Sequence, residues 1–224
     1  SRAIEAEERE ACEKRNIETE QVPVANDGIA VVTNKQLRID CLTVDELKDL
    51  FGPDADARTF RDVNPRFPPQ QASFFTPGEE SGTFDFFTEA ALETDAEQRT
   101  EGVQTSADDN QLVTGVSGTP GGIGYFGFSF FQENQQKLNA VAIDGGDGCV
   151  RPSTETIQNG TYKPLGRQVF MYPSKQAMQR PEVAEFMRFT TANAPRIAEA
   201  AQMIPLTTEQ VSEARRAVQK LAGG

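Results

Sequence analysis

The sequence contains no histidine and no tryptophan, and only three of its 224 residues are cysteines. Without histidine, a Ser-His-Asp triad, a His-activated cysteine and the usual His-containing zinc site are all excluded. No apolar run reaches the length of about 18 residues that a membrane-spanning helix needs. The first residues lack an apolar stretch and are not a signal peptide, so any targeting segment is expected to have been removed or to lie outside this chain.

Positive charge is also scarce. The chain has 22 Lys and Arg residues and 34 Asp and Glu residues, which gives a net charge of −12. Nucleic acids and anionic membrane surfaces require clustered cations, so neither is expected as a partner. Apolar residues make up 37% of the chain, which is enough for a hydrophobic core. At about 150 residues per domain, the length indicates one large domain or two small ones.

The cysteines, Cys12, Cys41 and Cys149, do not form a CxxC pair. This spacing argues against a metal ribbon or a thioredoxin-type redox site. An odd number of cysteines fits one disulfide and one remaining thiol. A bridge between Cys41 and Cys149 would close a long loop and would imply an oxidising compartment. The sequence alone leaves the pairing open.

Short strand patterns alternate with helix patterns along the chain, which predicts an α/β fold. Residues 21–34 are expected to form an extended strand that a turn at 26–28 interrupts, because Asn, Asp and Gly favour turns. Thr43 and Glu46 form a capping box ahead of a predicted helix that ends at Gly52. Residues 5–15 are expected to form a charged, exposed helix. Three further helices are predicted near 181–193, 195–202 and 207–221.

Ser81-Gly82-Thr83 is the most informative local feature, because a strand and a turn precede it and a predicted helix follows. A helix N-terminus presents unpaired N–H groups and a partial positive charge. Flanking hydroxyls and a glycine that lets a ligand approach make such a terminus an oxyanion site. A serine that merely caps its helix fits the local pattern as well. Neighbouring features must therefore decide between these interpretations.

Two other motifs have simpler explanations. Residues 122–127 match GxGxxG, but the segment before them is a loop and aromatic residues fill it, so a packed Gly-aromatic strand and turn is expected rather than a dinucleotide site. Asp108-Asp109-Asn110 lacks the spacing of a calcium loop and fits the first turn of a helix expected to begin at Ser106. No metal site and no cofactor are predicted.

The run FFTPGEESGTFDFFTEA (74–90) resembles the anion-binding segment of PstS-type phosphate-binding proteins, the substrate-binding components of bacterial phosphate ABC transporters. Similar segments recur in the same order along the whole chain, which makes the resemblance far more specific than the SGT triplet alone. The segments include SRAI (1–4), VPVANDGIAVVTN (22–34), DCLTVDELKDLF (40–51), ADDNQLVTGV (107–116), GGIGYFGFSFF (121–131), PSTETIQNGTYKPLGRQVF (152–170) and MIPLTTEQ (203–210).

The resemblance implies a two-lobed periplasmic binding protein fold of type II, in which each lobe is a sheet flanked by helices. Residues 1–27 and 166–224 would belong to lobe one, and residues 28–165 to lobe two with the SGT segment. Family members usually carry about 80–100 further residues before the segment that starts here. Lobe one is therefore expected to be incomplete in this chain, and a separate N-terminal fragment is a candidate partner.

The resemblance also implies a set of phosphate-binding residues. Ser81, Gly82 and Thr83 match the family segment that binds phosphate through hydroxyls and amides. Arg2 stands where the family presents a binding residue, and its guanidinium suits a phosphate dianion. The Glu80 carboxylate, with that of Asp85 as a second candidate, would accept a hydrogen bond from the P–OH group that monohydrogen phosphate has and sulfate lacks.

The function expected from the resemblance is that of a receptor without enzymatic activity. It would bind inorganic phosphate between two lobes and deliver it to the membrane permease subunits of an ABC transporter, in the periplasm or at the cell surface or as a secreted protein. Two alternatives remain at this point. One is a secreted phosphatase that uses Ser81 or Thr83 as nucleophile, and the other is a binding protein for another oxyanion such as sulfate.

Overall fold

The computed structural model describes residues 3–222, and the chain divides into two compact units. Unit 1 comprises residues 1–27 and 167–224, and unit 2 comprises residues 28–166. Strand β1 (Val22–Asn34) passes from unit 1 into unit 2. Strand β9 (Gly166–Met171) pairs with β1 and begins at the boundary where the chain returns to unit 1.

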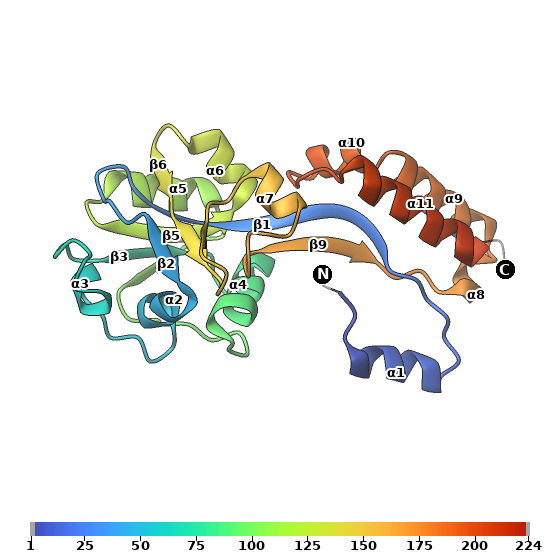
Figure 1. The fold of residues 1–224 in the computed structure, drawn as a ribbon, viewed down its shortest axis with the longest axis horizontal. Coiled ribbons are helices and arrows are strands. Elements are labelled where there is room, and N and C mark those ends of the chain that lie inside the picture. Colours follow the sequence, from blue (N-terminus) through green and yellow to red (C-terminus); the bar gives the residue numbers. More distant parts are fainter. Residues whose placement is uncertain (1–2, 223–224) are drawn as a thin grey trace. The chain divides into compact units, whose positions relative to one another are not determined.

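The main sheet of unit 2 has the strand order β4-β3-β5-β1-β6 (Figure 1). Its further strands are β3 (Ser73–Thr76), β4 (Val103–Thr105), β5 (Gly122–Gly127) and β6 (Leu138–Ala140). Strand β3 runs parallel to β4 and β5, whereas β1 runs antiparallel to β5 and β6. The carboxyl ends of β3, β4 and β5 therefore meet at one edge of the sheet.

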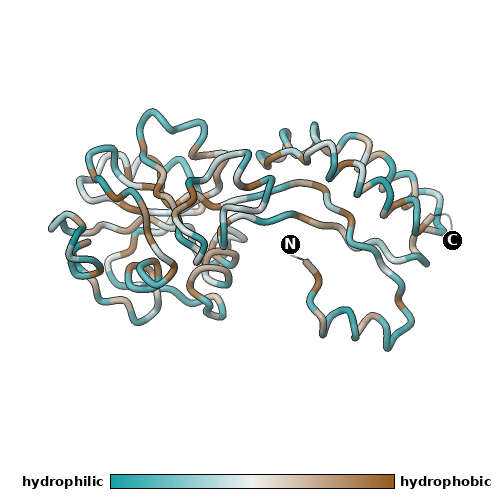
Figure 2. The backbone as a smooth tube through the Cα atoms, viewed as in Figure 1, coloured by the Kyte–Doolittle hydropathy of each residue, from teal (hydrophilic) through white to brown (hydrophobic). Residues whose placement is uncertain are grey.

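Helices cover both faces of this sheet. Consecutive residues of a strand point to opposite faces, so Phe75 and Phe74 of β3 contact different helices. On one face, α5 (Asp109–Gly118) packs so closely on Phe75 that a Cβ at Gly115 would collide with the ring. On the other face, Phe51 of α2 (Val44–Phe51) meets Phe74 edge to face, with ring centroids 5.5 Å apart. Figure 2 shows hydrophobic residues along the strands of unit 2. The other helices of unit 2 are α3 (Phe60–Val63), α4 (Gly82–Phe87), the π-helix η1 (Thr88–Leu92), α6 (Phe128–Asn134) and α7 (Thr154–Gln158).

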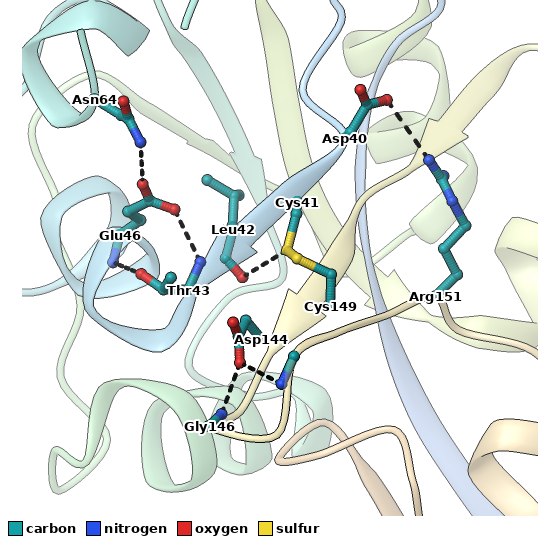
Figure 3. The surroundings of a disulfide bond; sticks show 11 residues. Asp40, Cys41, Leu42, Thr43, Glu46, Asn64, Asp144, Gly146, Cys149 and Arg151 are labelled. Carbon is teal, nitrogen blue, oxygen red and sulfur yellow. Dashed lines mark hydrogen bonds and ion pairs between the residues drawn. A yellow bond between two sulfur atoms is a disulfide. The ribbon is translucent and has the colours of Figure 1, made fainter. Parts of the chain in front are cut away.

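A second, three-stranded sheet in unit 2 consists of β2 (Cys41–Thr43), β7 (Ala142–Asp144) and β8 (Cys149–Val150). A disulfide joins Cys41 of β2 to Cys149 of β8 (Figure 3), which settles the pairing that the sequence left open. Cys12 is the free thiol.

Reduction of this disulfide is expected to lower the free energy of unfolding by about 4 kcal/mol, because the bridge constrains a long loop of the unfolded chain. The two cysteines are 108 residues apart in sequence. Urea unfolding with and without a reductant measures the effect. Cys12→Ser should show the same loss as the original chain, since Cys12 is not bridged. An unfolding midpoint that does not move on reduction would contradict this prediction.

Unit 1 contains the helices α1 (Ala6–Lys14), α8 (Lys175–Met178), α9 (Pro181–Ala192), α10 (Ala194–Ala200) and α11 (Thr208–Ala222). Its core joins β1 to α8, α9, α10 and α11 through buried residues such as Val22, Met187, Leu206 and Val218. Helix α1 buries none of its residues, as its charged sequence predicts. Within residues 3–222, no helix is long and apolar enough to cross a membrane.

The predicted turn at residues 26–28 is wrong, because β1 is continuous from Val22 to Asn34. Asn26 is fully buried and exchanges two backbone hydrogen bonds with Ile204, of 2.8 and 2.9 Å. Its side-chain amide donates to the Pro205 carbonyl and to Gln210 Oε1. These partners all belong to unit 1 and lie far away in sequence, so they satisfy a polar residue that looks locally like a turn former.

Helix boundaries follow the capping chemistry. Thr43 Oγ1 accepts from the Glu46 N–H at 3.1 Å and the Glu46 carboxylate accepts from the Thr43 N–H at 2.9 Å, which confirms the predicted capping box of α2 (Figure 3). The predicted helix start at Ser106 is wrong. Asp108 caps α5, and Ser106 Oγ accepts from the Asp108 N–H in the preceding turn.

Candidate functional site

The SGT segment lies at the edge of the main sheet where three parallel strands end. Thr76 ends β3, and β4 and β5 end beside it at Thr105 and Gly127. Residues 77–81 connect Thr76 to the start of α4. In α/β sheets, ligands bind outside the carboxyl ends of the strands. The topology of unit 2 therefore places the predicted anion-binding segment at the edge where a ligand is expected.

The start of α4 is open to solvent. Ser81 caps the helix, since its Oγ accepts from the Thr83 N–H at 3.2 Å and its carbonyl accepts from the Asp85 N–H at 3.1 Å. The first N–H groups of a helix have no acceptor within it. Ser81 Oγ occupies the Thr83 N–H, and within residues 3–222 the N–H groups of Gly82 and Phe84 have no acceptor, so they are left for a ligand. Gly82 is exposed, and a Cβ built on it would meet no atom within 4 Å.

The helix behind this opening is anchored by aromatic packing. Phe84, Phe86 and Phe87 are all buried. The Phe87 ring stacks on Tyr125 of β5 at 3.8 Å between centroids and meets Phe51 edge to face at 5.4 Å. This packing fixes the direction of the helix, so its N-terminal amides are held in place before any ligand arrives.

A partly buried chain of hydrogen bonds supports the strand end that leads into the loop. Gln98 Nε2 donates to Thr76 Oγ1 at 2.9 Å, and the Tyr125 hydroxyl donates to Gln98 Oε1 at 2.8 Å. Burial raises the pKa of Tyr125, so its hydroxyl remains a neutral donor. The sequence analysis missed this chain. Thr76 could have been noticed as a polar residue at the end of an apolar strand, whereas Gln98 lies in a segment that carries no motif.

The other predicted site residues lie as follows. Glu80 is exposed, and its carboxylate lies against Gly78 in the same loop, where a Cβ would collide with it. Asp85 is exposed in the first turn of α4. Arg2 lies outside the described residues. Because residues 73–90 contain no Lys or Arg, the segment itself offers amides and hydroxyls but no cation.

Asp109 is a further acidic residue that follows β4, a neighbour of β3. Burial, with a smaller contribution from the nearby Asp108, raises the pKa of its carboxyl group. The acidic residues do not form a metal centre, since residues 3–222 contain no group of three or more His, Cys, Asp or Glu side chains that could hold a metal ion.

Comparison with known proteins identifies the family. Residues 1–194 match the PBP superfamily domain. The chain belongs to the PBP superfamily. A related protein, SphX of Synechococcus elongatus, is 42% identical over 218 residues, which are 96% of this chain and 64% of SphX. PstS of Staphylococcus saprophyticus, named a phosphate-binding protein, is 29% identical over 226 residues, which are 100% of this chain and 69% of PstS.

Solved structures of the PBP superfamily agree with this assignment. The crystal structure of a possible phosphate binding protein from Planctomyces limnophilus matches with a TM-score of 0.92 at 33% identity, covering 99% of this chain and 79% of that one. The predicted α/β class and periplasmic binding protein fold are therefore confirmed, as is the resemblance to the PstS family. The chain spans 64% of the length of SphX.

Proposed function

We propose that this chain binds inorganic phosphate at the start of α4 and belongs to the substrate-binding component of a phosphate ABC transporter. The observation that carries the proposal is the open helix terminus, where Ser81 caps the helix and Gly82 leaves the approach to the amides unobstructed. Such a terminus favours anions through its N–H groups and its dipole. The relatives named as phosphate-binding proteins support phosphate as the anion.

Short-range interactions must hold the phosphate. The protein has a net charge of −12, so its long-range field repels a dianion. Salt screens that repulsion beyond about 8–10 Å, whereas amides, hydroxyls and a nearby cation act at contact. We assign the amides to Gly82 and Phe84 and hydroxyl contacts to Ser81 and Thr83. Arg2 supplies the guanidinium in this proposal.

Selectivity against sulfate requires an acceptor for the phosphate proton. Monohydrogen phosphate carries that proton at neutral pH, and sulfate does not. We assign the acceptor role to the Glu80 carboxylate, which belongs to the loop immediately before Ser81. A carboxylate that accepts this proton repels sulfate, because no proton then separates the two negative charges.

The protein acts in this proposal as a receptor and not as a phosphatase. Ser81 and Thr83 have no histidine to activate them, because the chain contains none. We assign residues 28–165 to the lobe that carries the SGT segment, and residues 1–27 and 166–224 to the other lobe. The permease subunits of the transporter would take the phosphate. The Cys41–Cys149 disulfide supports a periplasmic or cell-surface location, since disulfides persist in oxidising compartments.

Calorimetric titration of this chain with phosphate tests the proposal. We expect one-to-one binding of phosphate and no heat from sulfate at the same concentration. Ser81→Ala should weaken phosphate binding by at least about tenfold, because hydrogen bonds to a charged ligand contribute about 1.5–3 kcal/mol.

Ser153→Ala is the matched control for this titration. Ser153 caps α7 in the same unit by the same type of hydrogen bond, from the Thr156 N–H at 3.0 Å. If loss of a serine cap alone weakened phosphate binding, both variants would show the weaker binding. Loss of a ligand contact weakens phosphate binding only in Ser81→Ala. Equal heats for phosphate and sulfate, or turnover of a chromogenic phosphate ester that Ser81→Ala abolishes, would overturn the proposal.

A further inference from the structure

Unit 2 also contains a cavity of about 550 Å³ beside the end of β1, which positively charged side chains line. Lys35, Arg38 and Arg151 line it, and Asp40 is the acidic residue among the lining side chains. Among its apolar lining residues, Leu37, Ile39 and Leu138 are at most 4% exposed and belong to the core, whereas Phe131 is partly exposed. The cavity thus combines a cationic rim with one partly exposed aromatic residue in a protein whose net charge is −12.

This cavity is remote from the SGT segment within unit 2. Strand β1 is antiparallel to β5, with Ile29 opposite Gly127 and Thr33 opposite Ile123. Residues 35–40 follow the end of β1, so they lie at the edge where β5 begins. The SGT segment follows the end of β3, which runs parallel to β5. The cavity and the SGT segment therefore lie at opposite edges of the main sheet, and a ligand in one does not occupy the other.

The three cations differ in how many hydrogen bonds and ion pairs they already make within the protein. Lys35 Nζ donates to the carbonyls of Gln135 and Leu138, at 2.9 and 3.0 Å. Arg151 donates through one nitrogen to the Ala140 carbonyl at 2.8 Å. For Arg38, which is exposed, the described residues provide no hydrogen bond and no ion pair. Arg38 is therefore the cation whose whole guanidinium is available to a ligand.

Arg151 can exchange its partner for a ligand. Its second nitrogen lies 3.6 Å from Asp40 Oδ1, in an ion pair whose side chains are 59% and 95% exposed (Figure 3). Exposed pairs of this length contribute little free energy, so an external carboxylate competes readily with Asp40. The Ala140 hydrogen bond meanwhile holds the guanidinium in place. The adjacent Cys41–Cys149 disulfide also ties together the two segments that carry Asp40 and Arg151.

We infer that this cavity is a second anion site, which takes an organic carboxylate whose hydrocarbon portion rests on Phe131. Guanidinium groups bind carboxylates through two parallel hydrogen bonds. Guanidinium groups bind phosphate as well, but phosphate has no hydrocarbon portion to place on Phe131. The Asn139 amide in the cavity is already committed to the carbonyls of Asn34, Lys35 and Leu37, so it adds no neutral donor for phosphate. The partly exposed Phe131 ring favours the hydrocarbon portion.

Titration with glutarate, followed by amide NMR at low ionic strength, tests this inference. We expect saturable shifts in the amides of residues 37–40, 138–140 and 151, and none in residues 78–84. Arg38→Gln should weaken the binding of glutarate by about tenfold. Asp40→Asn should strengthen it by about twofold or more, because the competing carboxylate is removed.

Arg66→Gln is the matched control, because Arg66 is an exposed arginine of the same unit that does not line the cavity. It should leave glutarate binding unchanged. Equal losses for Arg66→Gln and Arg38→Gln, equal shifts with uncharged glutaramide, or phosphate binding in this cavity as tight as glutarate would each overturn the inference. The SGT segment is monitored by separate resonances, so the result is independent of the proposed phosphate site.

Discussion

Gly82→Ala is expected to weaken phosphate binding by at least about tenfold without lowering the stability of the fold. A Cβ at Gly82 meets no protein atom within 4 Å, so the folded chain accommodates it. The added methyl group stands instead at the exposed helix terminus through which a phosphate oxygen must reach the amides. Excluding one charge-assisted hydrogen bond costs about 1.5–3 kcal/mol, which corresponds to about tenfold or more in affinity.

Gly118→Ala serves as the control for this substitution. Gly118 ends α5 in the same unit, and a Cβ there also meets no atom within 4 Å. Both variants should unfold at or slightly above the midpoint of the original chain, since alanine reduces the freedom of the unfolded backbone. Phosphate calorimetry should separate them, with a loss for Gly82→Ala alone. Unchanged phosphate affinity in Gly82→Ala would show that the helix terminus is not the route of the ligand.

Phe87→Ala is expected to lower the free energy of unfolding by about 3–5 kcal/mol, the usual cost of truncating a buried phenylalanine. Phe87 is completely buried, stacks on Tyr125 at 3.8 Å and meets Phe51 edge to face. Its removal leaves a cavity between α4 and the sheet, beneath the SGT segment. Urea unfolding followed by circular dichroism measures the loss.

Phe189→Ala is the corresponding exposed substitution. Phe189 lies on α9 with 56% of its surface exposed, so its truncation should change the free energy of unfolding by less than about 1 kcal/mol. A loss in Phe87→Ala no larger than that in Phe189→Ala would contradict the assignment of Phe87 to the aromatic packing that anchors α4.

Local chemistry made several elements predictable. The capping box of Thr43 and Glu46 and the serine at the start of α4 use hydrogen bonds between residues two or three apart, so a short stretch of sequence contains all the partners. The GxGxxG segment formed the expected strand, β5, because close strand pairing requires glycine there. A Cβ at Gly124 would collide with the carbonyl oxygen of Phe75 on β3.

Long-range partners explain what the sequence could not predict. Asn26 looked like a turn residue because Asn, Asp and Gly follow one another there. The hydrogen-bond partners that keep it in a strand, Ile204, Pro205 and Gln210, stand near the other end of the chain. Gln98, which connects Thr76 to Tyr125 beneath the candidate site, was missed because both partners are distant from it in sequence. In both cases a polar side chain, buried at Asn26 and partly buried at Gln98, is satisfied by distant residues, and no local pattern records that pairing.

The most direct test of the central claim is an amide NMR titration of this chain with phosphate, observing Gly82 and Phe84. If phosphate binds at the start of α4, both amide protons accept a new charged partner. They should shift to lower field and saturate with the same affinity that calorimetry gives. Saturable phosphate binding in the calorimeter while the Gly82 and Phe84 resonances stay unmoved would contradict the proposed site.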